Sequence, residues 1–273
     1  MTGPTATEPS DPIPTDVVDR IQGFRLELAR RCATTTAPSA FGAFYLHDGF
    51  PKRYDSNYLW VDGPFEGVSV DDLVAETDRV LGGAGLEHRE ILVEDAVAGA
   101  RVAWRLRELG WWVDHLVLLA KLRDADRPAV GHARRVDFEH ARPLIEEIVR
   151  RQPPASSDEV VRQLVEHRRL LEEVAGARFF VVEADGAPAS ICELYVIDGV
   201  AQIEDVNTLE EHRGLGLARA VVLAAVEQAS ELGCDVVFLT ADDEDWPKRM
   251  YAKLGFDPVG RFWGFVRPSA DGL

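Results

Sequence analysis

The chain has 273 residues, 46% of them hydrophobic, and a formal net charge of −17 at pH 7. This length suits one large or two modest domains, and the hydrophobic content is enough to build real cores. So acidic a chain is a poor partner for the phosphate backbone of DNA or RNA, and we expect no nucleic-acid partner. The negative charge favours solubility and also suits cationic, amine-bearing substrates.

The cysteines and the N-terminal residues indicate in which cellular compartment the protein is expected. The three cysteines are Cys32, Cys192 and Cys234, and no two of them form a Cys-x-x-Cys pair. A sparse, odd set is typical of reduced, buried thiols, so we expect a cytoplasmic protein. Residues 1–14 are rich in Thr and Pro and predict a disordered tail. No apolar run is typical of a signal peptide or long enough to span a bilayer, so we expect no membrane partner.

After this tail, helices and strands alternate. Apolar residues at helical spacing predict helices over residues 15–31, 71–81 and 96–109. Runs of β-branched and aromatic residues predict strands over residues 41–46, 58–61, 90–93 and 112–122. The charged, proline-containing segment 123–130 then marks a boundary. We therefore expect one domain over residues 15–126 and another over residues 127–273.

The second domain begins with helices and continues with strands. We expect a strand over residues 132–136, helices over 138–151 and 157–173, and strands over 178–184, 189–197 and 201–208. The dipeptides Asp185-Gly186 and Asp198-Gly199 separate the last three strands and are good hairpin signals.

The stretch over residues 206–218 predicts a strand, a glycine turn with Gly214 and Gly216, and then a long helix. The first N–H groups of a helix have no partner within it, and the helix dipole adds positive potential there. Glycine lets a phosphate approach the backbone closely, and Arg213 adds a cation that can fork onto phosphate oxygens. The turn therefore predicts an anion site.

A second motif follows this helix. Residues 235–240 predict a strand, and the acidic residues before Pro247 predict a helix entry with Asp245 as its N-cap. That helix contains Tyr251 and ends at Gly255, which reads as its C′ residue.

In this order, the two motifs resemble the GNAT superfamily of N-acetyltransferases. The coenzyme A segment of that family reads Gln/Arg-x-x-Gly-x-Gly/Ala, and residues 213–218 fit it as Arg-Gly-Leu-Gly-Leu-Ala. In the other possible framing, Glu211 stands where the family has Gln or Arg. The family's Tyr-x-x-Leu-Gly-Phe is matched by residues 251–256, whereas Asp245 replaces the usual Asn at the helix entry. The resemblance covers about the last half of the chain.

The resemblance implies both a fold and a binding site. The implied fold class is α/β (α+β), with a mixed, mostly antiparallel sheet flanked by helices, and the implied co-substrate is acetyl-CoA. The strand before the turn binds the pantetheine arm, and the amides of the turn bind the pyrophosphate. The implied cofactor-binding residues are Val206, Asn207, Thr208, Arg213, Gly214, Leu215, Gly216, Leu217, Ala218 and Asp245. Tyr251 occupies the family's usual general-acid position.

The family has no fixed general base, so we infer this group from location. Glu204 and Asp205 lie on the strand before the turn, and consecutive strand residues face opposite sides. Glu204 shares its face with Val206 and Thr208. We therefore predict Glu204 as the base or amine-binding group, with Asp205 in reserve and Glu193 on the neighbouring strand as a further candidate.

The first half repeats part of this pattern. Gly110 and Trp111 follow a helix and begin a strand, as Gly255 and Phe256 do. We therefore expect tandem GNAT-like domains, the first of them degenerate, because acidic residues 71–72 at its helix entry repel a pyrophosphate. Two such halves form an internal pseudo-dimer, and the protein is expected to be a monomer or a homodimer.

Other chemistries lack their motifs. The 7 histidines are scattered without His-x-x-x-His spacing, so we expect no metal. A serine hydrolase would need Gly-x-Ser-x-Gly, which is absent.

The sequence thus predicts an acetyl-CoA-dependent N-acetyltransferase that acts on a primary amine of a small molecule or peptide. Two alternatives stay open. One is a non-catalytic acyl-CoA-binding regulator, which needs neither acid nor base. The other is a tandem-GNAT synthase that acetylates a thiol-sugar cofactor precursor.

Overall fold

The computed structural model describes residues 15–63, 69–129, 131–151 and 157–269, so the predicted tail over residues 1–14 lies outside the described part. Its strands form one 11-stranded sheet in the order β1-β2-β3-β4-β11-β5-β10-β9-β8-β7-β6. The strands are β1 (Thr35–Ser39), β2 (Gly42–Leu46), β3 (Tyr58–Val61), β4 (Arg89–Val93), β5 (Trp112–Lys121), β6 (Arg134–Val136), β7 (Arg178–Ala184), β8 (Ala187–Ile197), β9 (Val200–Thr208), β10 (Val236–Asp242) and β11 (Phe256–Arg267).

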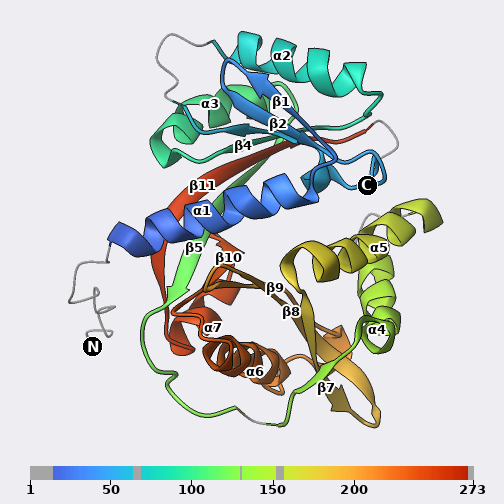
Figure 1. Ribbon diagram of the computed structural model, residues 1–273, viewed down its shortest axis with the longest axis vertical. Helices are drawn as coiled ribbons and strands as arrows, with labels where there is room; N and C mark the ends of the chain where they lie inside the picture. The colour runs from blue at the N-terminus through green and yellow to red at the C-terminus, as the bar shows by residue number, and fades with distance from the viewer. Residues whose placement is uncertain (1–14, 64–68, 130, 152–156, 270–273) are drawn as a thin grey trace.

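Helices cover both faces of this sheet (Figure 1). They are α1 (Thr15–Cys32), α2 (Val70–Gly83), α3 (Ala96–Glu108), α4 (Phe138–Arg151), α5 (Asp158–Ala175), α6 (Leu217–Glu231) and α7 (Pro247–Lys253), with 3-10 turns η1 (Tyr54–Ser56) and η2 (Glu210–His212). A core beneath α2 and α3 includes Leu73 and Phe265. In the C-terminal half, α6 and α7 pack on one face of the sheet, and α1, α4 and α5 pack on the other.

The two halves do not keep to separate sheets, because they exchange their last strands. β5 lies between β10 and β11, and β11 lies between β4 and β5. The first half thus supplies a strand to the second, and the second supplies one to the first. The boundary predicted at residues 126 and 127 falls in the connection between β5 and β6, and it stays a prediction.

The exchange extends to α1, which crosses the front of the sheet in Figure 1. Phe24 of α1 meets Phe238 of β10 edge to face, with ring centroids 5.3 Å apart. Arg20 pairs with Asp235, and Arg31 donates to the backbone oxygen of Val174. The first helix of the chain therefore completes the core of the C-terminal half.

The repeat predicted from Gly110-Trp111 and Gly255-Phe256 is visible in the way the strands of the two halves pair. β3 and β4 pair in parallel, as β9 and β10 do, and the other recorded pairings of the sheet are antiparallel. Gly110 and Gly255 end α3 and α7 with φ angles of 83° and 89°, and each precedes a buried aromatic residue. This mixed, mostly antiparallel sheet with a tandem arrangement confirms the predicted fold class.

Candidate active site

The site begins where β9 and β10 separate. Their parallel ladder runs from Val200↔Val236 to Ile203↔Leu239 and then stops. Beyond that point β10 stays paired with β5, whereas β9 continues beside β8 as far as Thr208. The edge of β9 that faces β10 is therefore without a strand partner over residues 204–208, which is the segment expected to bind pantetheine.

The glycine turn lies at the end of this open strand. Gly214 and Gly216 have φ angles of 81° and 82°, and a Cβ added to Gly214 would meet no atom within 4 Å. Gly216 is the N-cap of α6 and offers no side-chain cap. By contrast, side chains cap α2, α3 and α5, through Ser69, Asp95 and Ser157 respectively. The first N–H groups of α6 are thus left for a ligand.

A cavity of about 680 Å³ adjoins the turn, and we call it the glycine-turn cavity. The structure brings together here most of the predicted cofactor-binding residues and Tyr251. Those lining the cavity are Val206, Asn207, Thr208, Arg213, Gly214, Gly216, Leu217, Ala218 and Asp245. Leu215 is 57% exposed and does not line it.

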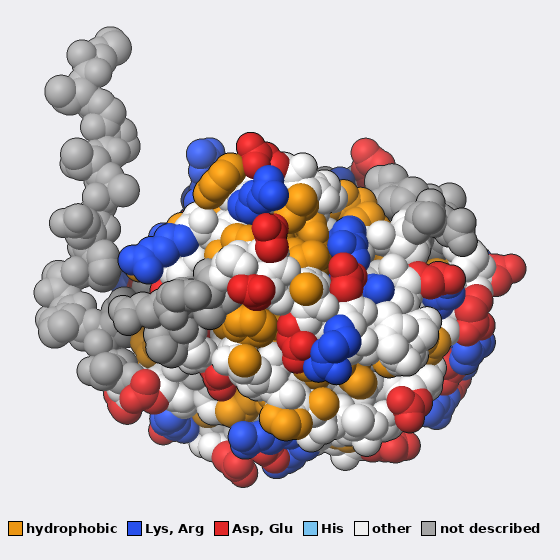
Figure 2. Space-filling view, turned by 90° about the horizontal axis from the view of Figure 1, so that it is seen from above, with side chains coloured by type: hydrophobic (Ala, Val, Ile, Leu, Met, Phe, Trp, Pro, Cys, Tyr) orange, Lys and Arg blue, Asp and Glu red, His pale blue; other side chains and the backbone are white. Residues whose placement is uncertain are grey.

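The glycine-turn cavity is cationic although the chain is acidic. Arg127, Arg249 and Lys253 line it beside Arg213, and none of these four makes an ion pair with any described residue. Arg219 also lines it but is paired with Asp126 at 2.8 Å. On the face shown in Figure 2, by contrast, acidic and basic side chains lie interspersed.

Sequence reasoning missed Arg127, Arg249 and Lys253. The last two are one helical turn apart on α7, so their spacing around Tyr251 was a usable signal. Arg127 comes from the segment after β5, and no local pattern joins it to the glycine turn.

The prediction that Asp245 caps α7 is wrong. The N-cap is Trp246, which has helical dihedrals and makes no side-chain cap. The Asp245 carboxylate instead accepts a hydrogen bond from the N–H of Trp246 at 2.7 Å. Asp245 itself stands one residue before the N-cap. Pro247 at the start of α7 lacks an N–H, which reduces the need for a cap.

Tyr251 lies on α7 and is 7% exposed. Its hydroxyl makes no hydrogen bond to another residue of the described chain, although the residue lines the glycine-turn cavity. Burial, followed by the charge of Glu204, raises the pKa of this hydroxyl above its ordinary value. Tyr251 therefore keeps its proton near neutral pH and is available as a hydrogen-bond donor.

A second cavity, of about 440 Å³, lies between the halves, and we call it the interhalf cavity. The first half contributes residues of α1, β3, β4 and β5, and the second contributes residues of α5, β8, β9, β10 and β11. Its charged lining residues are Arg25, Arg53, Asp55, Glu90, Glu204, Asp205 and Asp242.

Glu204 and Asp205 both line the interhalf cavity, so the expectation that only one could face it is wrong. The reason is a bulge in β9. Glu204 pairs with Glu193 and Asn207 pairs with Ile191, which leaves the residues between them out of register. Asp205 has a φ of 49°, and this conformation breaks the alternation of side chains along the strand.

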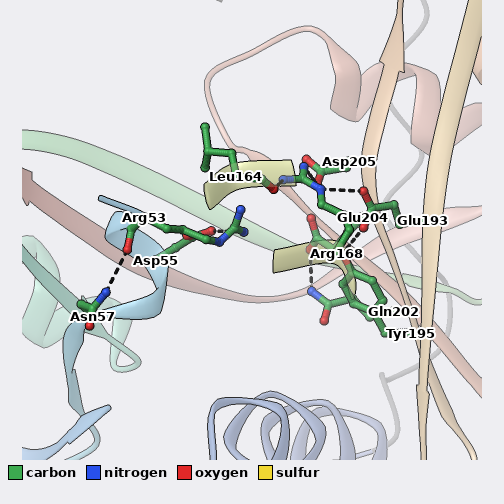
Figure 3. Close-up of polar contacts among 10 residues, drawn as sticks. All are labelled: Arg53, Asp55, Asn57, Leu164, Arg168, Glu193, Tyr195, Gln202, Glu204 and Asp205. Carbon is green, nitrogen blue, oxygen red and sulfur yellow. Dashed lines mark hydrogen bonds and ion pairs between the residues drawn. The ribbon is translucent and has the colours of Figure 1, made fainter. Parts of the chain in front are cut away.

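Arg168 of α5 holds the bulge in place (Figure 3). It donates to Glu193 Oε1 at 3.0 Å and to Asp205, and Tyr195 donates to Glu193 Oε2 at 2.5 Å. Burial raises the pKa of Asp205, but the charges of Arg168 and Arg53 outweigh it and hold that pKa below its ordinary value. The ionised form of Asp205 is thus favoured, and its carboxylate serves as the partner of Arg168.

Glu193, the third candidate, is 1% exposed and lies beside a smaller cavity of about 180 Å³. Burial raises the pKa of its carboxyl to about 7, against the opposing charge of Arg168. Because Arg168 and Tyr195 occupy its oxygens, it is less free to exchange protons than Glu204.

Glu204 has no cationic partner among the described residues. Its Oε1 accepts a hydrogen bond from Gln202 Nε2 at 2.5 Å. Burial, with the neighbouring charge of Asp205, raises the pKa of Glu204 to about 8. The charge of the same carboxylate contributes to the raised pKa of Tyr251, while Glu204 lines the interhalf cavity and Tyr251 lines the glycine-turn cavity.

Among the described residues, no group of three or more His, Cys, Asp or Glu side chains is arranged to hold a metal ion. In the same ranges, no helix combines the length and the apolar character needed to cross a bilayer.

Comparison with known families finds a match in the C-terminal part of the chain. Residues 142–256 match the family described as acetyltransferase (GNAT) family. The C-terminal part of the chain is a GNAT domain. A curated relative in Bacillus subtilis (strain 168), named "Putative ribosomal protein bS18-alanine N-acetyltransferase", is 29% identical over 85 residues. That match covers 31% of this chain and 56% of the relative, so the chain spans little more than half the relative's length.

Solved structures extend the likeness over both halves. A functionally unknown protein from Staphylococcus epidermidis has a TM-score of 0.65 at 17% identity, over 85% of this chain and 93% of its own. A GCN5-related N-acetyltransferase from Kribbella flavida has a TM-score of 0.63 at 20% identity, over 92% and 95%. A tandem GNAT protein from the clavulanic acid biosynthesis pathway has 0.54 at 19% identity, over 89% and 86%. At these identities the likeness concerns the fold, and that fold includes the N-terminal half.

Proposed function

We propose that this protein transfers the acetyl group of acetyl-CoA to a primary amine of a small molecule or peptide by direct attack. The observation that supports this most is the glycine-turn cavity. In a chain of net charge −17, it gathers cations that make no ion pair with the described residues around an uncapped helix start and an open strand edge.

Acetyl-CoA fits the groups of this cavity. Its pyrophosphate meets the N–H groups at the start of α6 and the guanidinium of Arg213. The pantetheine arm runs along the open edge of β9 over residues 206–208. Arg249 and Lys253 on α7 supply further positive charge for the phosphates.

The two candidate catalytic groups divide the proton transfers. Glu204 accepts a proton from the substrate ammonium group, and the neutral amine attacks the thioester carbonyl carbon. As the new C–N bond forms and the C–S bond breaks, the leaving thiolate takes a proton from the Tyr251 hydroxyl. The new amide nitrogen then gives up its extra proton, which returns Tyr251 to its neutral form. Glu204 is a better base than Asp205, because Arg168 holds Asp205 ionised and its pKa low.

Calorimetric titration with acetyl-CoA tests the binding half of this proposal. We expect one site per chain, lost in Gly216→Glu, since a carboxylate at the turn repels the pyrophosphate. Arg213→Ala should weaken binding about tenfold, the loss of roughly one charge-assisted hydrogen bond, without changing the unfolding midpoint. Arg162→Ala, at an exposed site on α5, is the matched control. Absence of binding at millimolar acetyl-CoA refutes the proposal, and two sites would mean that the N-terminal half also binds.

Turnover is tested separately, by thiol release from acetyl-CoA with a panel of primary amines. Glu204→Gln and Tyr251→Phe should each lower kcat by about 10²-fold or more, as expected for loss of a general base or acid. Tight acetyl-CoA binding without turnover of any amine would favour the non-catalytic acyl-CoA-binding regulator.

A further inference from the structure

We propose that the acceptor is an elongated small molecule with two cationic groups, a linear diamine or polyamine. Its reacting amine lies beside Glu204, and its second cationic group is bound by Glu90 of the N-terminal half. This inference rests on the proposed acetyl transfer and assigns the interhalf cavity as the acceptor site.

The first argument is the pairing of charges in the interhalf cavity. Its two arginines are already engaged, Arg25 with Glu94 at 2.6 Å and Arg53 with Asp55 at 2.7 Å. Asp205 is paired with Arg168. Three acids that line the cavity, Glu90, Glu204 and Asp242, make no ion pair within the described ranges. Glu90 comes from the N-terminal half, and the other two come from the C-terminal half.

The second argument is the set of buried polar atoms without partners. Glu90 is 6% exposed and its Oε2 has no hydrogen-bond partner among the residues described. Gln202, 7% exposed, has an unpartnered Oε1, and His167, 5% exposed, has an unpartnered Nδ1. All three residues line the interhalf cavity, as does Arg53, whose Nε also lacks a partner among the residues described. Because buried polar groups are normally satisfied, the two unpartnered oxygens in the wall of this cavity point to a ligand that brings donors.

The third argument is the order in which acidic and apolar side chains follow one another across the sheet. Glu90 lies on β4 and Glu204 on β9, with β11, β5 and β10 between them. At a strand spacing of about 4.8 Å, these strands lie ~19 Å apart along the sheet. Leu116 of β5 and Phe262 of β11 line the cavity between the two acids, together with Asp242 of β10 and with Arg25, whose guanidinium lies over the Phe262 ring. The acids at the two ends match ammonium groups, and the apolar side chains between them match a methylene chain.

The volume and the cover of the cavity suit a small molecule. About 440 Å³ falls within the usual range for small-ligand pockets. Residues of α1 and α5, among them Leu28 and Leu171, line it, so helices lie over the sheet surface where the ligand sits. Tyr58 and Tyr195 add aromatic rings that favour a nearby cation, whereas the Trp60 ring already has the Arg25 guanidinium 5.0 Å from its centroid.

The test compares diaminoalkanes, from butane-1,4-diamine to decane-1,10-diamine, with alkylamines of matched length. Thiol release is measured at saturating acetyl-CoA. We expect kcat/KM for the best diamine to exceed that of its matched monoamine by at least about tenfold, the effect of one partly buried charge pair. Glu90→Gln should reduce that ratio to below about threefold. Glu227→Gln, an exposed site on α6, should leave the ratio unchanged.

A second readout guards against misfolding of the variant. Glu90→Gln removes a buried carboxyl that lacks a cation, so we expect an unfolding midpoint equal to or higher than that of the wild type. Diamines should raise the midpoint of the wild type but not that of Glu90→Gln.

The outcomes separate the two proposals. If acetyl-CoA binds but monoamines react as well as diamines, or no diamine reacts, the dication inference is wrong and the proposed cofactor site stands. A diamine preference that survives Glu90→Gln would also overturn it. If acetyl-CoA does not bind, the proposed function itself fails.

Discussion

Arg168 is the most consequential single side chain of the site, because it pairs with two acids at once, the buried Glu193 and the half-buried Asp205. It pairs with Glu193 and Asp205, and its side chain is 8% exposed. Removing one partner of a buried ion pair leaves an uncompensated charge, so Arg168→Met should destabilise the fold by about 3–5 kcal/mol. The next residue provides the control. Arg169 is 47% exposed and pairs with Glu139, so Arg169→Met should cost less than ~1 kcal/mol. Urea unfolding measures both, and equal effects would contradict the buried network.

Glu204 should control the pH dependence of catalysis. Its pKa of about 8 means that the basic form accumulates as pH rises toward that value. We expect kcat/KM to rise along a limb with an apparent pKa near 8, and we expect this limb to disappear in Glu204→Gln. A pH profile at limiting amine, corrected for ionisation of the amine itself, measures it.

The same shift has a consequence for stability. A carboxyl with a raised pKa binds more protons in the folded state than in the unfolded state between its ordinary pKa and about pH 8. Its contribution to stability therefore falls as pH rises through that window. Glu204→Gln should gain stability relative to the wild type over the same window, and a constant difference would count against the assigned pKa.

At the scale of elements, two equivalent glycines should respond differently to alanine. Gly255 has a φ of 89°, and an added Cβ would lie 1.9 Å from the backbone oxygen of Arg123. Gly110 has a φ of 83°, but its added Cβ would meet nothing within 4 Å. We expect Gly255→Ala to cost more than ~3 kcal/mol and Gly110→Ala about 1 kcal/mol. Thermal unfolding compares them, and similar costs would show that the chain around Arg123 can move.

Most elements were predictable because their signals are local. The predicted strands at 58–61 and 178–184 and the helix at 138–151 have the observed bounds. Both Asp-Gly turns have the positive φ angles that such hairpins require. β1 was missed, because its sequence Thr-Thr-Ala-Pro-Ser is polar and exposed and contains Pro38. Such a segment has no alternating pattern, and it pairs only because β2 lies next to it.

The site was predictable to the extent that it is contiguous in sequence. The glycine turn and Tyr251 belong to short motifs, and they share one cavity. The bulge at Asp205 was not predictable from the regular alternation of side chains between the two faces of a strand, since one residue at positive φ shifts that alternation. Glu90 lies on β4, beside the exchanged strand β11, and lines the interhalf cavity, whereas Arg127 lies in the long connection after β5 and lines the glycine-turn cavity. Only the tertiary structure brings these two residues to the cavities.

At the scale of the molecule, the exchanged strands should make the two halves unfold together. β11 is the neighbour of both β4 and β5, so neither half has a complete sheet alone. We expect one urea transition with coincident midpoints from tryptophan fluorescence, weighted toward the N-terminal half, and from labelling of buried Cys192 in the C-terminal half. A chain truncated after residue 254 should lose both signals. Two separate midpoints would contradict this coupling.

The late position of β11 also affects how the chain is made. On the ribosome, β4 is complete at Val93, but the strand that covers its edge begins only at Phe256. At 5–20 residues per second, the nascent chain carries that open edge for roughly ten to thirty seconds. An unpaired strand edge is a template for aggregation. We therefore expect the nascent chain to need chaperones most, and to be most sensitive to the speed of translation, during this interval, before the last strand closes the sheet.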